Sequence, residues 1–393
     1  MTGGAHSPCV RIALVSDTYT PQVNGVTTVV YRIASLLRAQ GHDVSLVAPR
    51  YPNGSPSTDP HELRIPAAAF PLYPDIRLAF PPFRRVGRFF DASPPDVVHV
   101  HTEGPLGLAG RRWALSRRIP LVTSYHTNFP EYSRHYGVGF LEPLVWRWLR
   151  WFHGPARVTF TPGEAIRDEL IRRGLGQTAV WGRGVDPHFF HPGRRDGSWR
   201  RWLAGGDDTA VVLHVGRLAH EKNLRVLIEA WRQARAALGQ RAAFVIAGEG
   251  PESRRLQSEL PFVRMLGFLP RTDLATLYAS ADVCVFPSHT ETCGLVALEA
   301  MASGIAVIAA DAGGFRESIG RGTNGLLVPA HEPEGYAAAI AALVNDPAAR
   351  FALAAAARDR ALGRDVVHEN TELLDRYAKL AGVSDRRTSP CAA

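Results

Sequence analysis

Several features that would place a protein in a familiar class are absent from this chain of 393 residues. Its four cysteines show no spacing typical of a metal site or a disulfide framework, so a reducing compartment is the simplest expectation. No N-terminal apolar segment is long enough to predict a signal peptide, and no apolar run reaches the roughly 18 residues that cross a bilayer. We therefore expect a cytoplasmic protein, and leave open a peripheral position on the inner face of the cytoplasmic membrane.

Three site motifs are also missing. The loop at 18–27, after the first expected strand, lacks the Gly-x-Gly-x-x-Gly pattern of a dinucleotide site, which argues against a nicotinamide-dependent dehydrogenase. No Asp-x-Asp occurs, so a metal held by that pair of carboxylates is not expected. The net charge of +8 suits anionic partners, but no nucleic-acid module signature is present, and we expect no nucleic acid.

The pattern that remains is that of an α/β protein with two domains, and the length suffices for two sizeable cores. We expect a first Rossmann-like domain over 1–192, a second over 193–363, and a segment 364–393 that holds a last helix and a tail. The expected strands are 10–17, 43–49, 63–67, 97–101, 121–126, 157–161 and 178–181 in the first domain, and 211–216, 244–248, 265–269, 283–286, 306–310 and 325–329 in the second.

The stretch 283–299, VCVFPSHTETCGLVALE, predicts a buried strand, a polar loop and the start of a helix. The first turn of a helix has no internal acceptors for its amides, and the helix dipole favours negative charge there. The amides expected to be available to an anion are those of Cys293, Gly294 and Leu295.

Two carboxylates flank this corner, Glu291 in the loop and Glu299 on the helix. Together with the amides they suit a ligand that carries phosphates and several hydroxyls, as a nucleotide-sugar does. Taken alone, two acids at this spacing more often belong to an ordinary helix start with a capping acid.

A pair of cations follows the strand expected at 211–216, in the phrase GRLAHEKN. Arg217 offers a planar fork to phosphate oxygens, and Lys222 offers a mobile point charge. The pair would neutralise the charge that grows on a departing diphosphate. Solvated surface charges are the alternative interpretation.

Two features lie at strand ends of the expected first domain. Asn24 and Gly25 precede the helix expected at 26–40, and a glycine there lets the backbone approach a ligand phosphate closely; a plain turn is the alternative. His126 ends the strand expected at 121–126, where ligands of open α/β sheets collect, although a lone histidine at such a place is often structural.

These motifs resemble those of retaining GT-B glycosyltransferases of family 4, along almost the whole chain. ETCGLVALEAMASG is similar to the family's site for the sugar donor, with Cys293 where the family usually carries Phe. GRLAHEKN resembles its diphosphate clamp, PQVNGV its acceptor-side loop, SYHTNF the histidine that contacts the donor sugar and phosphate, and GVD with F-x-P its hinge. The resemblance implies the GT-B fold, two Rossmann-like, doubly wound parallel-sheet domains that face a central cleft. It also implies that the helix of segment 364–393 crosses back to the first domain before the tail.

The resemblance also implies roles for individual residues. Glu299 would accept hydrogen bonds from the ribose, Glu291 would hold a sugar hydroxyl, and the cation pair would take the diphosphate. The residues expected to be catalytic are Glu291, Arg217, Lys222 and His126. Those expected to bind substrate are Asn24, Gly25, Thr292, Cys293, Gly294, Leu295 and Glu299, with Gly267, Phe268 and Leu269 holding the base.

The implied reaction moves a hexose to a lipid or glycan hydroxyl with retention at the anomeric carbon. It needs no cofactor, because the nucleotide-sugar is a substrate, and we expect no metal. YTPQVNGV, SYHTNF and GRGVD resemble bacterial α-mannosyltransferases that use GDP-mannose on lipid acceptors, and also sulfoquinovosyl- and glucosyl-diacylglycerol synthases that use UDP-sugars. A non-catalytic binder of sugar nucleotides is a remote alternative, because all the expected site residues are present.

The stretch 140–153, FLEPLVWRWLRWFH, predicts an amphipathic helix rich in Arg and Trp. We expect one apolar face made of Leu141, Leu144, Val145, Trp148, Leu149 and Phe152. Such a helix, together with the basic and aromatic stretch 82–90, suits an anionic membrane surface and a lipid or polyprenyl acceptor. A core helix whose arginines face water is the alternative.

Overall fold

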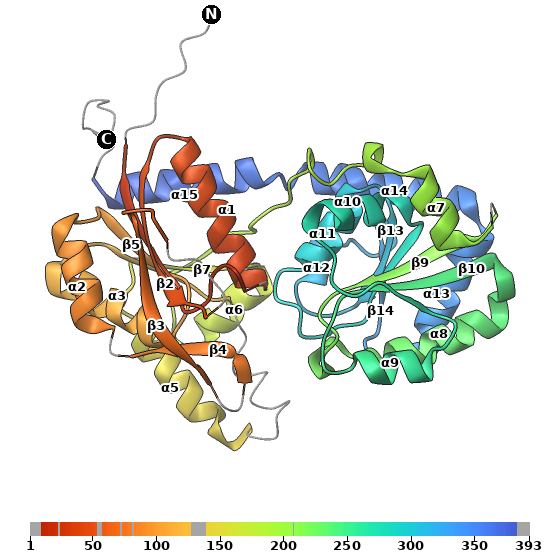
Figure 1. Cartoon of the computed structure of the whole chain (residues 1–393), viewed down its shortest axis with the longest axis horizontal. Helices are drawn as coiled ribbons and strands as arrows, with labels where there is room; N and C mark the ends of the chain where they lie inside the picture. The colour runs from red at the N-terminus through yellow and green to blue at the C-terminus, as the bar shows by residue number, and fades with distance from the viewer. Residues whose placement is uncertain are drawn as a thin grey trace, which may run out of the picture. The chain divides into compact units, whose positions relative to one another are not determined.

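The computed structural model describes residues 9–22, 24–52, 57–70, 73–80, 82–126, 139–206 and 208–382. The chain divides into two compact units, Met1–Trp181 with Asn370–Ala393, and Gly182–Glu369 (Figure 1). This division differs from the expected boundary at 192. The segment after Trp181 belongs to the second unit because Val185 exchanges backbone hydrogen bonds with Arg364 and Val366, at 2.9 and 2.8 Å.

The first unit is built on an eight-stranded sheet with the order β4-β3-β2-β1-β5-β6-β7-β8. All neighbouring strands are parallel except β3 and β4, which pair antiparallel at the edge. The strand β4 was not expected from the sequence. The strands are β1 Arg11–Val15, β2 Asp43–Arg50, β3 Glu62–Phe70, β4 Tyr73–Ala79, β5 Val97–Val100, β6 Leu121–Ser124, β7 Val158–Thr161 and β8 Thr178–Val180.

Helices cover this sheet, and α2 and α3 lie side by side in Figure 1. The rings of Phe90 on α2 and Trp113 on α3 are 5.0 Å apart, in a core that Ala13 and Val15 of β1 enter from the sheet. The helices of this unit are α1 Gly25–Ala39, α2 Phe83–Ala92, α3 Pro105–Arg117, α5 Glu142–His153, α6 Glu164–Arg172 and most of α15 Val366–Leu380.

The second unit has a six-stranded parallel sheet with the order β11-β10-β9-β12-β13-β14. Alternate residues of a strand point to opposite faces. Accordingly Val211 and Leu213 of β9 enter one core, and Ala210 and Val212 enter the other. The strands are β9 Ala210–Val215, β10 Ala242–Ala247, β11 Arg264–Met265, β12 Val283–Phe286, β13 Ala306–Ala310 and β14 Leu326–Val328.

Both faces of this sheet carry helices, as a doubly wound α/β unit requires. The helices α8, α9 and α13 contribute to one core, and α7, α10, α11 and α14 to the other. Their bounds are α7 Gly197–Ala204, α8 Leu224–Leu238, α9 Ser253–Glu259, α10 Arg271–Ser280, α11 Leu295–Ala302, α12 Phe315–Ser318, α13 Pro333–Asn345 and α14 Pro347–Leu362.

Two sequence-based predictions need correction. The strand expected at 265–269 is only Arg264–Met265, because Gly267 turns the chain with φ of 68° and α10 begins soon after. On α5 the buried face is Trp146, Leu149, Phe152 and His153, so Leu144 and Trp148, expected on the same side as Leu149 and Phe152, are instead exposed.

Two further findings concern the cysteines and the lengths of the helices. Cys284 and Cys293 are free thiols, whereas Cys9 is disulfide-bonded, which the cysteine spacing did not predict. Over the described residues no single helix is long and apolar enough to cross a membrane; only α13 and α14, bent by 105° at their junction, pass such a test as a pair.

Candidate active site

The expected residues of the second unit gather where the strand order of its sheet reverses. β9 is flanked by β10 on one side and β12 on the other, so the loops that leave β9 and β12 diverge at the carboxyl edge. Ligands of open α/β sheets bind at this position. The loop after β9 carries Arg217 and Lys222, and the loop after β12 carries Glu291.

Lys222 and Glu291 meet across these two loops. The Lys222 Nζ lies 2.7 Å from Glu291 Oε2, and the two side chains keep 25% and 19% of their exposure. The sequence GRLAHEKN was expected to lie beside this corner, and this contact places it there. Lys222 and Lys379 are the only lysines of a chain whose basic residues are otherwise arginines, so a lysine at this contact stands out.

Hydrogen bonds hold the two loops in register. The carbonyl of Glu221 accepts from the hydroxyl of Thr290 at 3.0 Å. The side-chain amide of Asn223 donates to the carbonyl of Pro287 at 3.0 Å and to that of Ala330 at 2.6 Å. The ion pair therefore sits on a fixed frame rather than on two independent loops.

A third loop, after β13, braces the backbone of Glu291. The Gly314 amide donates to the Glu291 carbonyl at 2.7 Å. Gly313 has φ of +52°, and a Cβ there would stand 2.2 Å from the same carbonyl oxygen. Only glycine lets the two segments approach so closely in this conformation.

The amides at the start of α11 are available for an anion, as the sequence predicted. Gly294 precedes the helix in the left-handed region, with φ of 68°, and no side chain caps it. Throughout the part of the chain that the structure describes, no carbonyl or side chain accepts from the amides of Cys293, Gly294 and Leu295. Free amides at a helix N-terminus, aided by the dipole, bind phosphate or sugar oxygens.

Cys293 is buried between this helix start and the beginning of the unit. Its thiol contacts the Gly182 carbonyl at 3.5 Å and lies beside the guanidinium of Arg183. Burial raises the pKa of the Cys293 thiol, and Arg183 only partly opposes the shift. The neutral thiol therefore acts as a small packing group, and its neighbour Thr292 remains partly exposed.

The second acid, Glu299, lies on α11. Burial raises the pKa of Tyr278 on α10 well above its usual range, and the carboxylates of Glu299, then Glu291, add to the shift. The field of both acids thus reaches the same buried phenol, which indicates that they lie on one side of the unit. Glu299 is partly exposed, so its carboxylate is accessible to a hydroxyl-bearing ligand.

The region expected to hold the base is a loop rather than a strand. Gly267 accepts from the Gly248 amide at 2.8 Å, and the Phe268 amide donates to Glu249 at 3.3 Å, which ties the loop to the one after β10. The Phe268 ring is 54% exposed, whereas Leu269 packs against the core. An exposed aromatic face at this edge suits stacking by a planar base.

The expected residues of the first unit lie at the carboxyl ends of its strands, or just after them. His126, 7% exposed, follows β6, and its Nε2 lies 3.0 Å from Nδ1 of His101. Asn24 caps α1, because its side-chain oxygen accepts from the Thr27 amide at 2.8 Å. A Cβ added at Gly25 would meet nothing within 4 Å, so the protein itself does not demand a glycine there.

Sequence analysis missed several buried polar residues near these strand ends. Asp17, after β1, accepts from the hydroxyl of Thr102 and from the amides of Leu106 and Gly107, at 2.7, 2.8 and 3.2 Å. Burial raises the pKa of Asp17 to about 6 despite these hydrogen bonds. The alternation His-Val-His at 99–101 was the available signal for two further buried imidazoles, His99 on β5 and His101 one residue beyond its end.

His214, on β9, is a further buried imidazole in the second unit. Its Nδ1 donates to the Val285 carbonyl at 2.8 Å. Burial lowers the pKa of His214 to about 4, with the Lys222 charge as a smaller contribution in the same direction. Among the described residues, no group of three or more His, Cys, Asp or Glu is placed to hold a metal ion.

Comparison with known proteins agrees with this geometry. The model of glycosyl transferases group 1 matches residues 198–360, and the model of glycosyltransferase family 4 matches residues 23–189. The structure of Anabaena Alr3699/HepE in complex with UDP aligns with a TM-score of 0.75 at 22% identity, covering 94% of this chain and 100% of that one. Sucrose-phosphate synthase from Thermosynechococcus elongatus aligns with a TM-score of 0.74 at 23% identity, covering 95% and 99%. The fold is that of the GT-B glycosyltransferases, as the sequence motifs implied.

Relatives of higher identity identify the family. A GDP-mannose-dependent alpha-mannosyltransferase of Mycobacterium tuberculosis (strain CDC 1551 / Oshkosh) is 37% identical over 392 residues, covering 98% of this chain and 99% of the relative. Sulfoquinovosyl transferase SQD2 of Arabidopsis thaliana is 33% identical over 299 residues, covering 74% and 58%. The chain belongs to the family 4 glycosyltransferases, and it is an enzyme of the hexosyltransferase class.

Proposed function

We propose that the protein transfers mannose from GDP-mannose to a hydroxyl of a lipid or glycan, with retention at the anomeric carbon and without a metal ion. The proposal is carried by one observation, the contact of Lys222 with Glu291 beside the amides that precede α11. A cation, a carboxylate and a helix N-terminus at one point match the diphosphate, the hydroxyls and the phosphate oxygens of a sugar nucleotide. The sequence identity to three GDP-mannose-dependent relatives, 32–37%, supports the choice of mannose as the sugar and guanine as the base.

The reaction needs charge stabilisation more than a separate acid or base. The bond between the anomeric carbon and the phosphate oxygen breaks, and a bond to the acceptor oxygen forms on the same face. The acceptor proton passes to the departing diphosphate. Arg217, Lys222 and the amides of α11 stabilise the growing negative charge, while Glu291 accepts from a sugar hydroxyl and Glu299 from the ribose.

Binding of the sugar donor is the first test. GDP-mannose, UDP-glucose, a UDP-sulfoquinovose and an ADP-sugar are compared by thermal shift, since a ligand at about 100 times its dissociation constant adds roughly 2.7 kcal/mol of stability. GDP-mannose is expected to give the largest shift. A larger shift with a UDP-sugar would instead support the diacylglycerol glycosyltransferase alternative, for which SQD2 and alpha-monoglucosyldiacylglycerol synthase of Streptococcus pneumoniae are the relevant relatives.

Transfer itself is the second test. Labelled mannose should pass from GDP-mannose to lipid extract with release of GDP, unchanged by EDTA and abolished in Glu291→Ala. Donor binding without transfer to lipid or glycan would favour the non-catalytic alternative. Activity lost in EDTA and restored by magnesium would contradict the metal-independent mechanism.

A lipid acceptor is supported by the exposed face of α5. Phe140, just before α5, and Leu144, Trp148 and Trp151 on it are 79%, 60%, 40% and 49% exposed, and the two tryptophan rings are tilted against each other with centroids 5.0 Å apart. Arg147 and Arg150 are exposed on the same helix, and Arg84, Arg85 and Arg88 on α2. Exposed aromatic side chains interleaved with arginines favour the interface of an anionic bilayer. We place the enzyme on the cytoplasmic side of such a membrane.

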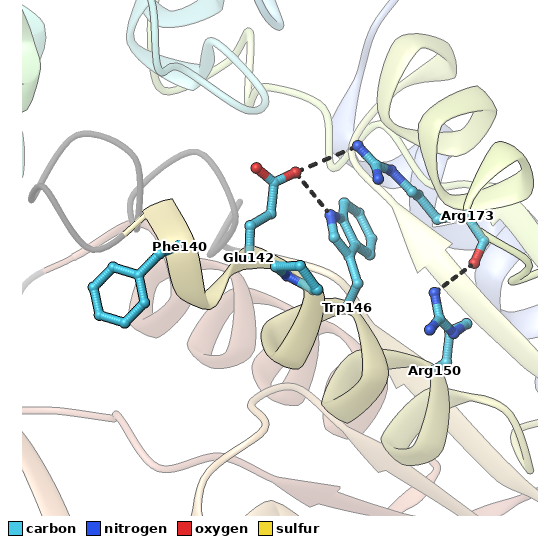
Figure 2. A pocket seen from close by; sticks show the side chains of 6 residues that line it. Phe140, Glu142, Trp146, Arg150 and Arg173 are labelled. Atoms are coloured by element: carbon cyan, nitrogen blue, oxygen red, sulfur yellow. Dashed lines mark hydrogen bonds and ion pairs between the residues drawn. The ribbon is translucent and has the colours of Figure 1, made fainter.

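A cavity of about 440 Å³ at the start of α5 adds a place for a headgroup, lined by Phe140, Glu142, Pro143, Trp146, Arg150 and Arg173 (Figure 2). The Glu142 carboxylate accepts from the Trp146 ring and from Arg173, at 3.2 and 3.4 Å, and Arg173 also pairs with Glu169. Arg150 donates to the Arg173 carbonyl, and no carboxylate among the described residues pairs with it. Arg150 is thus the cation that this cavity offers to an anionic lipid headgroup.

A further inference from the structure

The first unit has its own point where the strand order reverses, and two acids there take no part in the proposed mechanism. β1 is flanked by β2 on one side and β5 on the other, so the loops that leave β1 and β5 diverge at the carboxyl edge of the sheet. Ligands of open α/β sheets bind at such a point. Asp17 follows β1 and Glu103 follows β5, so each of these loops carries a carboxylate.

Asp17 is bonded to the protein through both of its oxygens. Its carboxylate accepts from the hydroxyl of Thr102 and from the amides of Leu106 and Gly107. A Cβ at Gly104 would lie 2.6 Å from the carboxyl carbon of Asp17, so the loop after β5 packs directly against this acid. Asp17 therefore anchors that loop and the start of α3 to β1, and we assign it a structural role.

Glu103, at the same edge, accepts fewer hydrogen bonds. Its Oε1 lies 3.1 Å from Nε2 of His153, and the side chains of His153 and Glu103 are 0% and 6% exposed. Among the described residues, the Glu103 carboxylate has no second partner. Burial raises the pKa of Asp17 to about 6, and the charge of Glu103 adds to the shift, so the field of Glu103 reaches this edge of the sheet.

The contact with His153 gives this hydrogen bond a direction. Nδ1 of His153 lies 2.9 Å from the hydroxyl of Thr123, which in turn lies 2.9 Å from that of Thr159. An ionised carboxylate can only accept, so Nε2 of His153 carries a proton and donates it to Glu103. Both ring nitrogens are thus engaged, and the imidazole holds the carboxylate in one orientation.

A buried histidine does not by itself require a carboxylate as its partner. A backbone carbonyl or a hydroxyl would accept from Nε2, whereas a nearly buried carboxylate costs free energy unless several donors surround it. Asp17 has three donors, and within the described part of the chain Glu103 has one. The second oxygen of Glu103, Oε2, therefore lacks a donor that the hydroxyl of a ligand would supply.

Backbone amides of the same loop suit the same kind of ligand. The amides of Glu103 and Gly104 find no acceptor in the part of the chain that the structure describes. A hydroxyl both donates and accepts, so this loop offers it an acceptor and donors together. A phosphate would suit the loop less well, because two carboxylates already lie at this edge and like charges repel.

We propose that Glu103, oriented by His153, binds a hydroxyl of the sugar or polyol part of the acceptor at the carboxyl edge of the first sheet. The inference rests on the proposed function, because it assigns this hydroxyl to the acceptor of that transfer. Glu103 binds and orients the acceptor, and it takes no proton in the reaction.

The kinetic test uses Glu103→Gln. This variant keeps an oxygen for His153 but places an NH2 group, which donates, where Oε2 stood. With GDP-mannose and lipid extract as substrates, it should lower kcat/KM for the acceptor about ten- to a hundredfold, the loss of one hydrogen bond to a charged group. The KM for GDP-mannose should not change, because the sugar donor is bound by the second unit in the proposed function.

Asp96→Asn is the matched control, because Asp96 lies at the other end of the same strand. Asp96 precedes β5 and accepts from the amide and the guanidinium of Arg11, at 2.9 and 2.7 Å. This variant should lose some thermal stability but keep kcat/KM for the acceptor. Equal kcat/KM for the acceptor in folded Glu103→Gln and the wild type would overturn the proposal, and so would an equal loss in Asp96→Asn.

A binding experiment separates this proposal from the transfer activity. Saturation-transfer NMR with methyl α-D-mannopyranoside and methyl α-D-glucopyranoside, without any sugar nucleotide, reports contact of each sugar with the protein. We expect at least one pyranoside to bind the wild type and Glu291→Ala but not Glu103→Gln. Binding that is lost in Glu291→Ala and kept in Glu103→Gln would overturn the proposal.

The unaltered protein keeps the proposal testable if Glu103→Gln folds poorly, because binding of neither pyranoside to the wild type would also overturn it. If the wild type transfers no mannose, the proposed function fails, and the pyranoside experiment still decides whether Glu103 binds a sugar hydroxyl.

Discussion

The Lys222 Nζ lies 2.7 Å from Oε2 of Glu291, across two loops that leave adjacent strands of one sheet. Each side chain therefore binds an oppositely charged group at the position that we propose for the sugar nucleotide. In the proposed function the diphosphate would compete with Glu291 for the Lys222 ammonium. A sugar hydroxyl would compete with Lys222 for the Glu291 carboxylate. The pair keeps both side chains extended towards that place.

The first prediction separates this contact from its function. Partly exposed ion pairs contribute about 0–1 kcal/mol, so Lys222→Met and Glu291→Gln should both keep a melting temperature close to that of the wild type. Each should lower kcat/KM about a hundredfold or more, because each removes a charge that meets the transition state. Steady-state kinetics and calorimetry on the same preparations give both quantities.

The charge-reversed double variant, Lys222→Glu with Glu291→Lys, is the sharper form of the experiment. It can restore the ion pair, and with it any stability lost in the single variants. It puts a carboxylate against the diphosphate, so its activity should stay at the level of the worse single variant. Recovery of activity along with stability would mean that the pair serves only the fold.

The second prediction concerns the loop after β13. Gly205 and Gly313 both have a positive φ, +72° and +52°, but a Cβ at Gly205 meets nothing within 4 Å, whereas one at Gly313 meets the Glu291 carbonyl. Gly205 lies in the left-handed region, so Gly205→Ala should cost about 1–2 kcal/mol, the price of that conformation for an L residue. Gly313→Ala should cost about 1–3 kcal/mol more, because Glu291 must move.

The functional part of this prediction uses the same two variants. Thermal-shift titrations should show that Gly313→Ala lowers the apparent affinity for GDP-mannose at least tenfold, because the displaced carbonyl belongs to Glu291. Gly205→Ala should respond to the sugar donor as the wild type does. Equal donor binding by the two variants would show that the brace on Glu291 is not needed for the site.

Local sequence signals sufficed for the strand and helix of the donor corner. The apolar run Val283–Phe286 is buried on both faces, as parallel strands are, and glycines mark both ends of α11, so its bounds match those expected. The same logic did not work at 265–269, where one glycine with positive φ ended the strand. Apolar residues alone do not show where a short edge strand stops.

Partners from distant parts of the chain were beyond local signals. The meeting of Lys222 with Glu291 depends on β9 and β12 being neighbours in the sheet, which motif resemblance anticipated but periodicity could not. The bond of His99 to Tyr377 joins residues 278 positions apart. On α5, periodicity found an amphipathic helix but not its buried face, because tryptophans and leucines occur on more than one side and only tertiary contacts select Trp146.

The third prediction concerns the exposed face of α5. In one variant Gln replaces all four of Arg84, Arg85, Arg147 and Arg150. Its affinity for anionic liposomes, measured by sedimentation, should be lower by about two to three orders of magnitude, at roughly 1 kcal/mol for each arginine. The loss should shrink as salt is raised. Unchanged binding of this variant to the liposomes would contradict a membrane-binding surface at these arginines.

Aromatic side chains give an independent arm of that experiment. Trp148→Ser with Trp151→Ser removes two neighbouring, exposed rings of α5 and should also weaken liposome binding. Trp202→Ser is the matched control, because Trp202 is 54% exposed but lies on α7 of the other unit. Equal losses in the two cases would point to nonspecific adsorption through surface tryptophans.

The last prediction concerns pH. The pKa of His214 is lowered to about 4 in the folded protein, chiefly by burial, against an ordinary value of 6.5. A group whose folded pKa is depressed stabilises the fold above its unfolded pKa, and this contribution is lost as pH falls from 6.5 to about 4. His214→Asn keeps an amide that can donate to the Val285 carbonyl but does not titrate. The unfolding free energy of the wild type minus that of His214→Asn, from urea titrations, should therefore fall by about 2–3 kcal/mol between about pH 7 and about pH 4.5.

Asp17, whose pKa is raised to about 6, acts in the opposite direction, because its contribution is present at low pH and lost as pH rises through about 6. It is common to both proteins and cancels in the difference. A difference that does not change with pH would mean that the pKa of His214 is the same in the folded and the unfolded protein, and the depressed pKa of a buried ring would be wrong.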